Sequence, residues 1–381
     1  MKRKVKLLAT SAMGLEAIVA NEVRALGYKD VTVENGKVMF EADVSAIPRC
    51  NLWLRSADRV KVIVGEFEAK TFDQLFEGTK ALDWHNYIPE EGSFPVIGKS
   101  VKSTLYSVSD CQRIVKKAVV DKLKLKHGVA GNMPETGAMY RIEVALLKDK
   151  VTLTLDSSGN GLHKRGYRVG QGEAPLKETL AASLVQLTNW RPEFPLVDLF
   201  CGSGTILIEA ALIGQNIAPG FNRDFASEEW DFVEQKFWDE AIDEAEQLAN
   251  YDQKLDITGT DIDPKMIAIA KQNAIEAGLA DLINWKQMAS QDFYPKQNNG
   301  YLISNPPYGE RLNELDEVEQ IYQMLGQTMK QNTSWSSYVL TSNENFEKLY
   351  GKKATKKRKL FNGYIKVDYY QYFGKFIKKD G

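Results

Sequence analysis

Residues 171–381 alternate short apolar runs, typical of buried β-strands, with segments whose apolar residues recur at helical spacing. Strands joined through helices run parallel in one sheet, because a parallel pair needs a crossover connection. The pattern therefore predicts the α/β class, with a doubly wound, mostly parallel sheet and helices on both of its faces. We expect strands at 194–200, 255–261, 300–304 and 337–342, and helices at 205–214, 264–278 and 317–331.

Boundary residues support two parts of this pattern. Asp263 is a suitable N-cap for the second helix, Pro264 fits its first turn, and Gly278 follows its last apolar residue. Near the C-terminus, Asn362-Gly363 separates two strand-like runs, which is the strongest short-range signal of a β-hairpin. We expect this antiparallel pair to close the sheet.

The first 170 residues have a different pattern, in which single helices lie between strand-like runs. Helices are expected at 13–28 and at 110–126, the second one basic and amphipathic. We infer two small α+β units and a linker at 157–170. The connection 215–254, within the rear part, is long enough to carry a helix of its own. The predicted domains are 1–60, 61–168 and 169–381.

The length and the charge distribution agree with several domains. A chain of 381 residues exceeds what one hydrophobic core usually serves. Residues 1–170 hold 27 Lys and Arg against 20 Asp and Glu (+7), and the remainder holds 22 against 31 (−9), for a net charge of −2. A modestly basic front part is compatible with contact to an anionic polymer.

Cysteine usage and hydropathy exclude several classes of protein. Cys50, Cys111 and Cys201 lie far apart, and no histidine stands near them at metal-ligand spacing. Neither a disulfide scaffold nor a zinc site is indicated. The N-terminus has no long uninterrupted apolar stretch, so no signal peptide or membrane span is predicted. We expect a cytoplasmic protein with no metal and no membrane contact.

A glycine loop follows the first predicted strand of the rear part. In "DLFCGSGT" (198–205), Gly202 and Gly204 let a ligand approach the backbone beside a helix N-terminus. The third glycine of a dinucleotide fingerprint is replaced by Leu207, and the loop has no phosphate-binding lysine. The ligand is therefore neither NAD nor a nucleoside triphosphate. At the end of the next strand, Asp261 is placed to accept hydrogen bonds from a ribose diol.

Three motifs in this order carry a family resemblance: "VDLFCGSGTILIEAAL", "GTDIDPKMIAIAKQNAIEAGL" and "SNPPYGERL". They resemble the class I S-adenosylmethionine-dependent methyltransferases, and N-P-P-Y resembles the branch that methylates exocyclic amino groups of bases. The resemblance implies a Rossmann-like sheet of seven strands. It also implies S-adenosylmethionine as cofactor, with the methionine end at Asp198, Gly202, Gly204 and Thr205, the ribose at Asp261, the adenine at Asp292 and Phe293, and a closing segment, 174–182, that contains Pro175, Lys177 and Thr179.

The N-P-P-Y tetrad has a chemical rationale. The amino group of guanine or adenine is a poor nucleophile because the ring delocalises its lone pair. Acceptance of its two N–H groups by the Asn305 side-chain oxygen and the Pro306 carbonyl would raise the electron density on nitrogen. Pro306 and Pro307 hold this arrangement in place before substrate arrives. Tyr308 offers a flat face for a flipped-out base.

The front part resembles the THUMP-containing RNA-modifying enzymes. "LLATSAMGLEAIVANEVRALGY" is similar to their N-terminal ferredoxin-like unit. "FDQLFEGTKALDWHNYIP", "DCQRIVKKAVVDKLK" and "LHKRGYR" are similar to the THUMP unit and its junction. The resemblance implies that an RNA backbone is held by Lys116, Lys117, Lys122, Lys124, Lys126, Lys164, Arg165 and Arg168.

Together the two halves resemble the bacterial large-subunit rRNA guanine-N2 methyltransferases and their tRNA relatives. Some of the rRNA enzymes carry a second methyltransferase unit, whereas this sequence holds the motifs of one. The hypothesis is N2-methylation of a guanosine in structured RNA, with 23S rRNA favoured over tRNA as partner. Adenine-N6 methylation of DNA or RNA and guanine-N2 methylation of tRNA remain as alternative reactions. A role without catalysis, as an RNA-binding ribosome assembly factor, also remains open.

Overall fold

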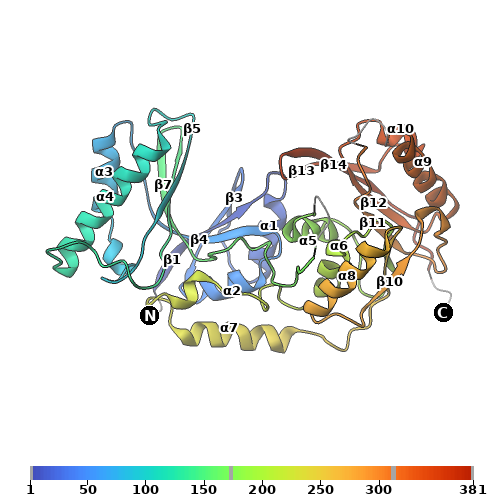
Figure 1. The fold of residues 1–381 in the computed structure, drawn as a ribbon, viewed down its shortest axis with the longest axis horizontal. Coiled ribbons are helices and arrows are strands. Elements are labelled where there is room, and N and C mark those ends of the chain that lie inside the picture. The colour runs from blue at the N-terminus through green and yellow to red at the C-terminus, as the bar shows by residue number, and fades with distance from the viewer. Residues whose placement is uncertain (1–2, 171–174, 310–314, 379–381) are drawn as a thin grey trace. The chain divides into compact units, whose positions relative to one another are not determined.

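The computed structural model describes residues 3–170, 175–309 and 315–378. The chain forms two compact units. The N-terminal unit comprises the residues up to 11 together with 19–162 and 224–245. The C-terminal unit comprises 12–18, 163–223 and the residues from 246 onward. Each unit is built around one seven-stranded sheet (Figure 1).

The sheet of the N-terminal unit is continuous across the two α+β units expected from the sequence. Its long strand β4 pairs with β1 through Ala57–Ile63 and with β7 through Lys61–Glu68. The predicted boundary at residue 60 therefore falls inside a strand that both halves share. In sheet order the strands are β2 (Thr32–Glu34), β3 (Lys37–Asp43), β1 (Lys4–Ser11), β4 (Ala57–Glu68), β7 (Lys150–Asp156), β6 (Ile142–Leu147) and β5 (Val96–Val101).

Both helices expected in the front part are present as α1 and α4. The expected basic helix, 110–126, extends by two residues at its start and one at its end. It packs against α3 and, through Cys111, Val115, Ala118, Val119 and Leu123, buries one face. The helices of the first 162 residues are α1 (Glu16–Ala25), α2 (Ala46–Trp53), α3 (Phe72–Ala81) and α4 (Val108–His127), with a short 3-10 turn at Trp84–Asn86.

The predicted extra helix within 215–254 is α7 (Gln235–Leu248), and most of it belongs to the N-terminal unit. A 3-10 turn, Ala226–Glu229, precedes it. The segment is anchored by Trp230, whose ring is stacked on Tyr140 at 5.3 Å and whose indole N–H donates to the Met139 carbonyl at 2.9 Å. A segment that lies between two strands of the rear sheet in sequence thus completes the front unit.

The C-terminal unit has the predicted doubly wound sheet. The neighbours from β10 to β12 are parallel, and β14 and β13 add an antiparallel pair. In sheet order the strands are β10 (Ile283–Gln287), β9 (Ile257–Asp261), β8 (Leu196–Asp198), β11 (Tyr301–Ser304), β12 (Ser336–Thr341), β14 (Ile365–Tyr372) and β13 (Lys356–Asn362).

Helices cover both faces of this sheet (Figure 1). One apolar cluster joins α5, α6 and α8 to the sheet, and a second joins α9 and α10 to its other face. A 3-10 turn, Ser290–Asp292, follows β10. The helices are α5 (Glu178–Gln186), α6 (Thr205–Gly214), α8 (Pro264–Glu276), α9 (Leu315–Gln331) and α10 (Phe346–Tyr350).

The sequence predictions for this unit are confirmed for four strands and three helices, and Asp263 caps α8 by accepting from the Lys265 N–H at 2.8 Å. The predicted hairpin is present, but its two-residue loop is Gly363-Tyr364, since Asn362 pairs with Ile365 as the last residue of β13. Strand β10 was not predicted. Along the described residues, no helix combines the length and apolar character needed to cross a lipid bilayer.

Packing of α9 against α10 gives a first testable prediction. A Cβ at Gly326 would lie 1.9 Å from the backbone oxygen of Tyr350. Alanine normally stabilises a helix by about 1 kcal/mol relative to glycine, but here it must push α10 away. We expect Gly326→Ala to lower the free energy of unfolding by about 1–3 kcal/mol in urea titrations.

The neighbouring residue supplies the control, since Gln327 is exposed and Gln327→Ala shortens a side chain on the same helix. We expect it to change the free energy of unfolding by less than about 0.5 kcal/mol. A Gly326→Ala protein as stable as the wild type would show that the α9–α10 contact is not close-packed.

Candidate active site

The strand order reverses at β8, which lies between β9 and β11. From β8 the chain first builds β9 and β10 on one side, and then returns to place β11 and β12 on the other side. In open α/β sheets, ligands bind beyond the carboxyl ends of the strands at such a reversal. The three motifs singled out in the sequence follow β8, β9 and β11, so the fold brings them to this one place.

A buried hydrogen bond joins the ends of β8 and β11. The Ser304 hydroxyl donates to Asp198 Oδ1 at 2.7 Å and accepts the Leu199 N–H at 3.1 Å. Burial raises the pKa of Asp198 from 3.8 to about 7, and the nearby charge of Asp261 contributes to this rise. The hydrogen bonds from Ser304 and the Phe200 N–H act in the opposite direction. Asp198 thus holds the glycine loop and the N-P-P-Y segment together.

Glycine is needed at the two positions of the loop for different structural reasons. Both have positive φ, 50° at Gly202 and 84° at Gly204. A Cβ at Gly202 would meet no atom within 4 Å, so this residue leaves its side open, as expected for ligand approach. A Cβ at Gly204 would lie 2.6 Å from the Trp285 ring. The expectation that Gly204 makes room for a ligand is thus replaced by a packing role against β10.

Asp261 is oriented by the backbone at the end of β9. Its Oδ2 accepts the Gly202 N–H at 3.0 Å, and its Oδ1 accepts the Asp263 N–H at 2.9 Å. An ionised carboxylate has about four acceptor positions, so each oxygen retains capacity for a further donor. This geometry suits the two hydroxyl groups of a ribose.

The N-P-P-Y segment is fixed by two tyrosines. The Tyr308 hydroxyl donates to Asn305 Oδ1 at 2.7 Å, so the side-chain oxygen expected to accept from a substrate already accepts from the chain. On α9, the fully buried Tyr322 donates to the Pro307 carbonyl at 2.8 Å and contacts the Thr341 hydroxyl at 2.8 Å. The first and last residues of the tetrad are therefore bonded to each other, and its third residue is bonded to α9.

Two adjoining hollows lie at this edge of the sheet and share Phe200 and Asn305. The smaller, of 140 Å³, is bounded by the glycine loop and by Pro175, Asp198 and Thr205. The larger, of 680 Å³, is bounded by Asp261, residues 289–291, the N-P-P-Y segment and the hairpin residues Asn362 and Ile365. An extended ligand with an amino-acid end and a nucleoside end fits this pair, and a second planar group can reach Asn305.

Some predicted cofactor residues lie outside the walls of these hollows. Asp292 is exposed, and the Phe293 ring packs edge-on against Trp335 at 5.7 Å. The preceding residues, 289–291, border the larger hollow instead. In the predicted closing segment, Lys177 is exposed at the N-cap of α5 and Thr179 is buried within that helix, while Ala174 lies outside the described residues. Residues 310–314, which continue the N-P-P-Y motif, also lie outside them.

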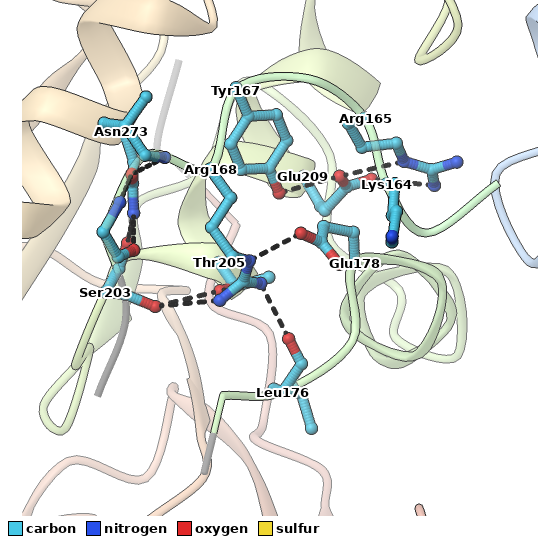
Figure 2. A network of polar contacts seen from close by, with 12 residues as sticks. Lys164, Arg165, Tyr167, Arg168, Leu176, Glu178, Ser203, Thr205, Glu209 and Asn273 are labelled. Carbon is cyan, nitrogen blue, oxygen red and sulfur yellow. Dashed lines mark hydrogen bonds and ion pairs between the residues drawn. The ribbon is translucent and has the colours of Figure 1, made fainter. Parts of the chain in front are cut away.

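The linker after the N-terminal unit is bonded into the glycine loop (Figure 2). Arg168 donates to Glu178 at 2.7 Å, to the Leu176 carbonyl at 2.9 Å, and to the hydroxyls of Ser203 and Thr205 at 3.3 and 3.0 Å. One guanidinium thus connects the linker, the segment before α5 and the start of α6. The prediction that Arg168 holds an RNA backbone does not fit, because these bonds occupy four of its five N–H donors and the side chain is only 15% exposed.

The prediction that Arg165 binds RNA is wrong as well, because this side chain is also engaged inside the domain. Its side chain is 3 % exposed and lies 3.3 Å from the carboxylate of Glu209, which is itself 0 % exposed. The Tyr167 hydroxyl donates to the same carboxylate at 3.0 Å (Figure 2). A buried charge needs such partners, and a guanidinium so enclosed cannot reach a phosphate on the surface.

The predicted RNA-binding lysines divide into two groups. Lys116 lies 2.6 Å from Glu135 and 3.5 Å from the centre of the Phe94 ring, and Lys122 lies 3.3 Å from Asp83. These two are engaged within the N-terminal unit. The other members, from α4 and from the linker, have side chains that are exposed or half-buried: Lys117, Lys124, Lys126 and Lys164.

Three polar residues important to the site were missed in the sequence. Asn273 is 1 % exposed on α8; it donates to the Gly170 and Ser203 carbonyls and accepts from the N–H groups of residues 169 and 170 (Figure 2). Glu209 and Tyr322 are the other two. Each stands on an apolar helix face, so a single polar side chain in an apolar stripe was the available signal.

Among the residues that the structure describes, no group of three or more His, Cys, Asp and Glu side chains is suited to a metal ion. The site therefore consists of glycine backbone, carboxylates and the N-P-P-Y segment.

Comparison with known families agrees with this geometry. The model described as "RMKL-like, methyltransferase domain" matches residues 165–371. The chain belongs to this family. In its front part, an "RlmL ferredoxin-like domain" matches 6–61 and a "THUMP domain" matches 69–156. The predicted architecture of ferredoxin-like, THUMP and Rossmann-like methyltransferase parts is thereby confirmed.

Two curated relatives differ in how much of them the chain covers. The "Putative RNA methyltransferase YpsC" of Bacillus subtilis is 64% identical over 374 residues, with 98% of this chain and 97% of the relative covered. The "Ribosomal RNA large subunit methyltransferase K/L" of Shewanella frigidimarina is 34% identical over 365 residues, or 93% of this chain. The chain spans about half of the latter's length, 51%.

Two solved structures are similar over almost the whole chain. A "predicted N6-adenine-specific DNA methylase" from Listeria monocytogenes has a TM-score of 0.94 and 60% identity and covers 98% of this chain and 97% of its own. SMU.472, "a putative methyltransferase complexed with SAH", has a TM-score of 0.94 and 50% identity and covers 99% and 100%.

The raised pKa of Asp198 gives a second prediction. A carboxyl whose pKa is higher in the folded than in the unfolded chain stabilises the fold below the unfolded value, and this stability is lost as the pH rises through the folded value. The C-terminal unit is thus expected to lose up to about 4 kcal/mol between about pH 4 and pH 7 through Asp198. In Asp198→Asn this loss disappears.

Hydrogen exchange at the amides of β8 measures the free energy of opening in the ligand-free protein as a function of pH. The companion variant Ser304→Ala removes a bond that lowers the pKa of Asp198, so its loss of stability should move to higher pH. Parallel pH profiles for the wild type and Asp198→Asn would contradict this assignment.

Proposed function

We propose that the chain transfers a methyl group from S-adenosylmethionine to the N2 amine of a guanosine in structured RNA, with 23S rRNA as the favoured substrate. The observation that carries the proposal is the position of Asn305, which borders both the hollow of the glycine loop and the larger hollow beside Asp261. A base amine placed at Asn305 would therefore face a methyl donor held by the loop. The SAH complex of the similar SMU.472 structure supports this donor.

Each part of the methyl donor can be assigned to residues of the site. In this assignment Asp261 accepts the ribose hydroxyls, and the open side of Gly202 admits the cofactor backbone to the start of α6. The methionine end lies in the hollow at Pro175, Asp198 and Thr205. S-adenosylmethionine supplies a methyl group on a positively charged sulfur, which makes that carbon open to attack by a weak nucleophile.

The N-P-P-Y segment then activates the amine. Asn305 Oδ1 and the Pro306 carbonyl accept its two N–H groups, which directs the nitrogen lone pair at the methyl carbon. As the N–C bond forms, the S–C bond breaks and its electron pair stays on sulfur. The nitrogen becomes positively charged and acidic, and it releases one proton to solvent. No dedicated base is required.

Tyr308 has two roles in this proposal. Its hydroxyl occupies one lone pair of Asn305 Oδ1 and orients the amide, while the second lone pair remains for a substrate N–H. Its ring offers the stacking face for the flipped-out base. Tyr322 supports both acceptors indirectly, because its bond to the Pro307 carbonyl fixes the residue that directly follows them.

RNA as substrate is supported by the match to a THUMP domain and by the names of the relatives, one an RNA methyltransferase and one a ribosomal RNA methyltransferase. We assign the accessible lysines Lys117, Lys124, Lys126 and Lys164 to the RNA backbone. The division into 1–60, 61–168 and 169–381 is retained as a functional proposal, with RNA held by the front parts and chemistry performed by the last.

Adenine-N6 methylation is the second candidate, since the Listeria monocytogenes structure carries that description and an adenine amine suits the same acceptors. The choice between guanine and adenine rests on the RNA-related relatives and on the THUMP match. A preference of the purified chain for DNA over RNA would favour the second candidate.

The experiment that tests the function is a mass spectrum of nucleosides from rRNA and tRNA of a deletion strain, compared with the parent. We expect one N2-methylguanosine to be lost from 23S rRNA and to return when the purified chain and S-adenosylmethionine are added. Unchanged N2-methylguanosine in both RNA pools would refute the proposal, and a loss confined to tRNA would redirect it.

Substitution of Asn305 separates catalysis from binding. Removal of one positioned acceptor is expected to slow methyl transfer at least about 100-fold in Asn305→Ala. The affinity for SAH, measured by calorimetry, should stay within about twofold, and Tyr308→Phe, which keeps the ring, should lose less activity. Full biological function of Asn305→Ala would instead support a role as an RNA-binding assembly factor.

A further inference from the structure

We infer that the β13–β14 hairpin, residues 356–366, is a second RNA-binding element, located in the methyltransferase domain beside the substrate hollow. The inference rests on the proposed function and adds to it the surface that holds the RNA flanking the target base. It commits to RNA as the occupant, held through phosphates by lysines and through one base by Tyr364.

The charge of this region is opposite to that of its surroundings. Residues 352–366 contain seven basic residues and no acidic one, whereas residues 171–381 as a whole carry a net charge of −9. Among the described residues, Lys356, Lys359 and Lys366 are exposed and have no carboxylate within 4 Å. Lys357 differs, because Asp368 lies 3.7 Å from its ammonium group.

The tip of the hairpin carries an aromatic side chain in full contact with solvent. Tyr364 has a relative exposure of 104 %, and the adjoining Ile365 is 40 % exposed. A large ring held out from a two-residue turn buries no apolar area in the protein. Stacking on a base is the interaction that such a ring offers to a single-stranded stretch of nucleic acid.

The hairpin is continuous with the proposed catalytic site. Asn362 and Ile365 border the same 680 Å³ hollow as the N-P-P-Y segment and Asp261. Tyr364 lies directly between these two residues in the turn, and Lys366 follows them on β14. Nucleotides next to a base flipped into this hollow therefore pass the hairpin tip.

Protection of a sheet edge explains only part of the pattern. Strand β13 is the outermost strand of its sheet (Figure 1), and lysines on edge strands prevent pairing with other sheets. Edge protection also covers Lys366, because β14 pairs with β12 only from Asp368 onward, but Tyr364 lies beyond the ladder. An exposed tyrosine at the tip adds apolar surface and so does not protect the edge from association. RNA binding accounts for the exposed tyrosine together with the lysines around it.

The test compares two triple variants with the same change of charge. The hairpin variant is Lys356→Gln/Lys359→Gln/Lys366→Gln. The control, Lys271→Gln/Lys296→Gln/Lys330→Gln, replaces three exposed lysines of the same unit that also have no carboxylate within 4 Å among the described residues. A third variant is Tyr364→Ala. The affinity of each for SAH, measured by calorimetry, reports that the fold is retained.

RNA affinity is measured by fluorescence anisotropy at several salt concentrations, with a fragment of 23S rRNA from the deletion strain. The slope of log affinity against log salt should decrease by about three in the hairpin variant and much less in the control. Tyr364→Ala should bind about fivefold or more weakly, with an unchanged slope. Methyl transfer by both should show a raised KM for RNA and nearly unchanged kcat.

The outcomes distinguish this inference from the proposed function. If the wild type methylates RNA and the hairpin variant matches the control in slope and KM, the hairpin inference is overturned while the function stands. If the wild type transfers no methyl group to any RNA of the deletion strain, the function fails and the inference falls with it. Loss of affinity in the hairpin variant alone confirms the element.

Discussion

The hydrogen bond between Ser304 and Asp198 is the constraint on which the site depends. It joins the carboxyl ends of two strands that are neighbours in the sheet, although the two bonded residues are 106 positions apart in sequence. Because Asp198 opens the glycine loop and Ser304 immediately precedes Asn305, the bond holds the glycine loop against the N-P-P-Y segment. Burial of the Asp198 carboxyl raises its pKa and makes the site sensitive to pH, whereas the bond from Ser304 opposes this shift.

A second set of bonds ties this centre to the entry of the chain into the domain. Arg168 and Asn273 connect the linker to the glycine loop and to the segment before α5, and Arg165 anchors the linker on α6 through Glu209. Arg165 and Arg168 were predicted from the sequence as RNA contacts, yet their ion pairs with Glu209 and Glu178 hold them inside the domain. The basic residues that we assign to RNA are therefore those of the hairpin, the accessible lysines of α4 and Lys164 of the linker.

The sequence predicted the parts of the fold that follow periodic or capping rules. The strands around β8, the helix capped by Asp263 and the hairpin near Gly363 all follow from local patterns, and the strand reversal follows from their alternation. Strand β10 was missed because Asn284, Lys286 and Gln287 interrupt its apolar residues. The engagement of Arg165 and the packing of Gly204 against Trp285 depend on contacts across 44 and 81 positions, which no local pattern encodes. That most of α7 belongs to the N-terminal unit likewise depends on tertiary contacts and not on a local pattern.

In the proposed reaction, Asn305 Oδ1 and the Pro306 carbonyl receive the amine of one purine next to the glycine loop. A crystal structure of the chain with SAH and an RNA that carries the target guanosine tests it directly. We expect the guanine amine within hydrogen-bond distance of both oxygens, the base stacked on Tyr308, and the Ser304–Asp198 bond retained. A base bound away from residues 305–308, or SAH bound elsewhere than between Gly202 and Asp261, would contradict it.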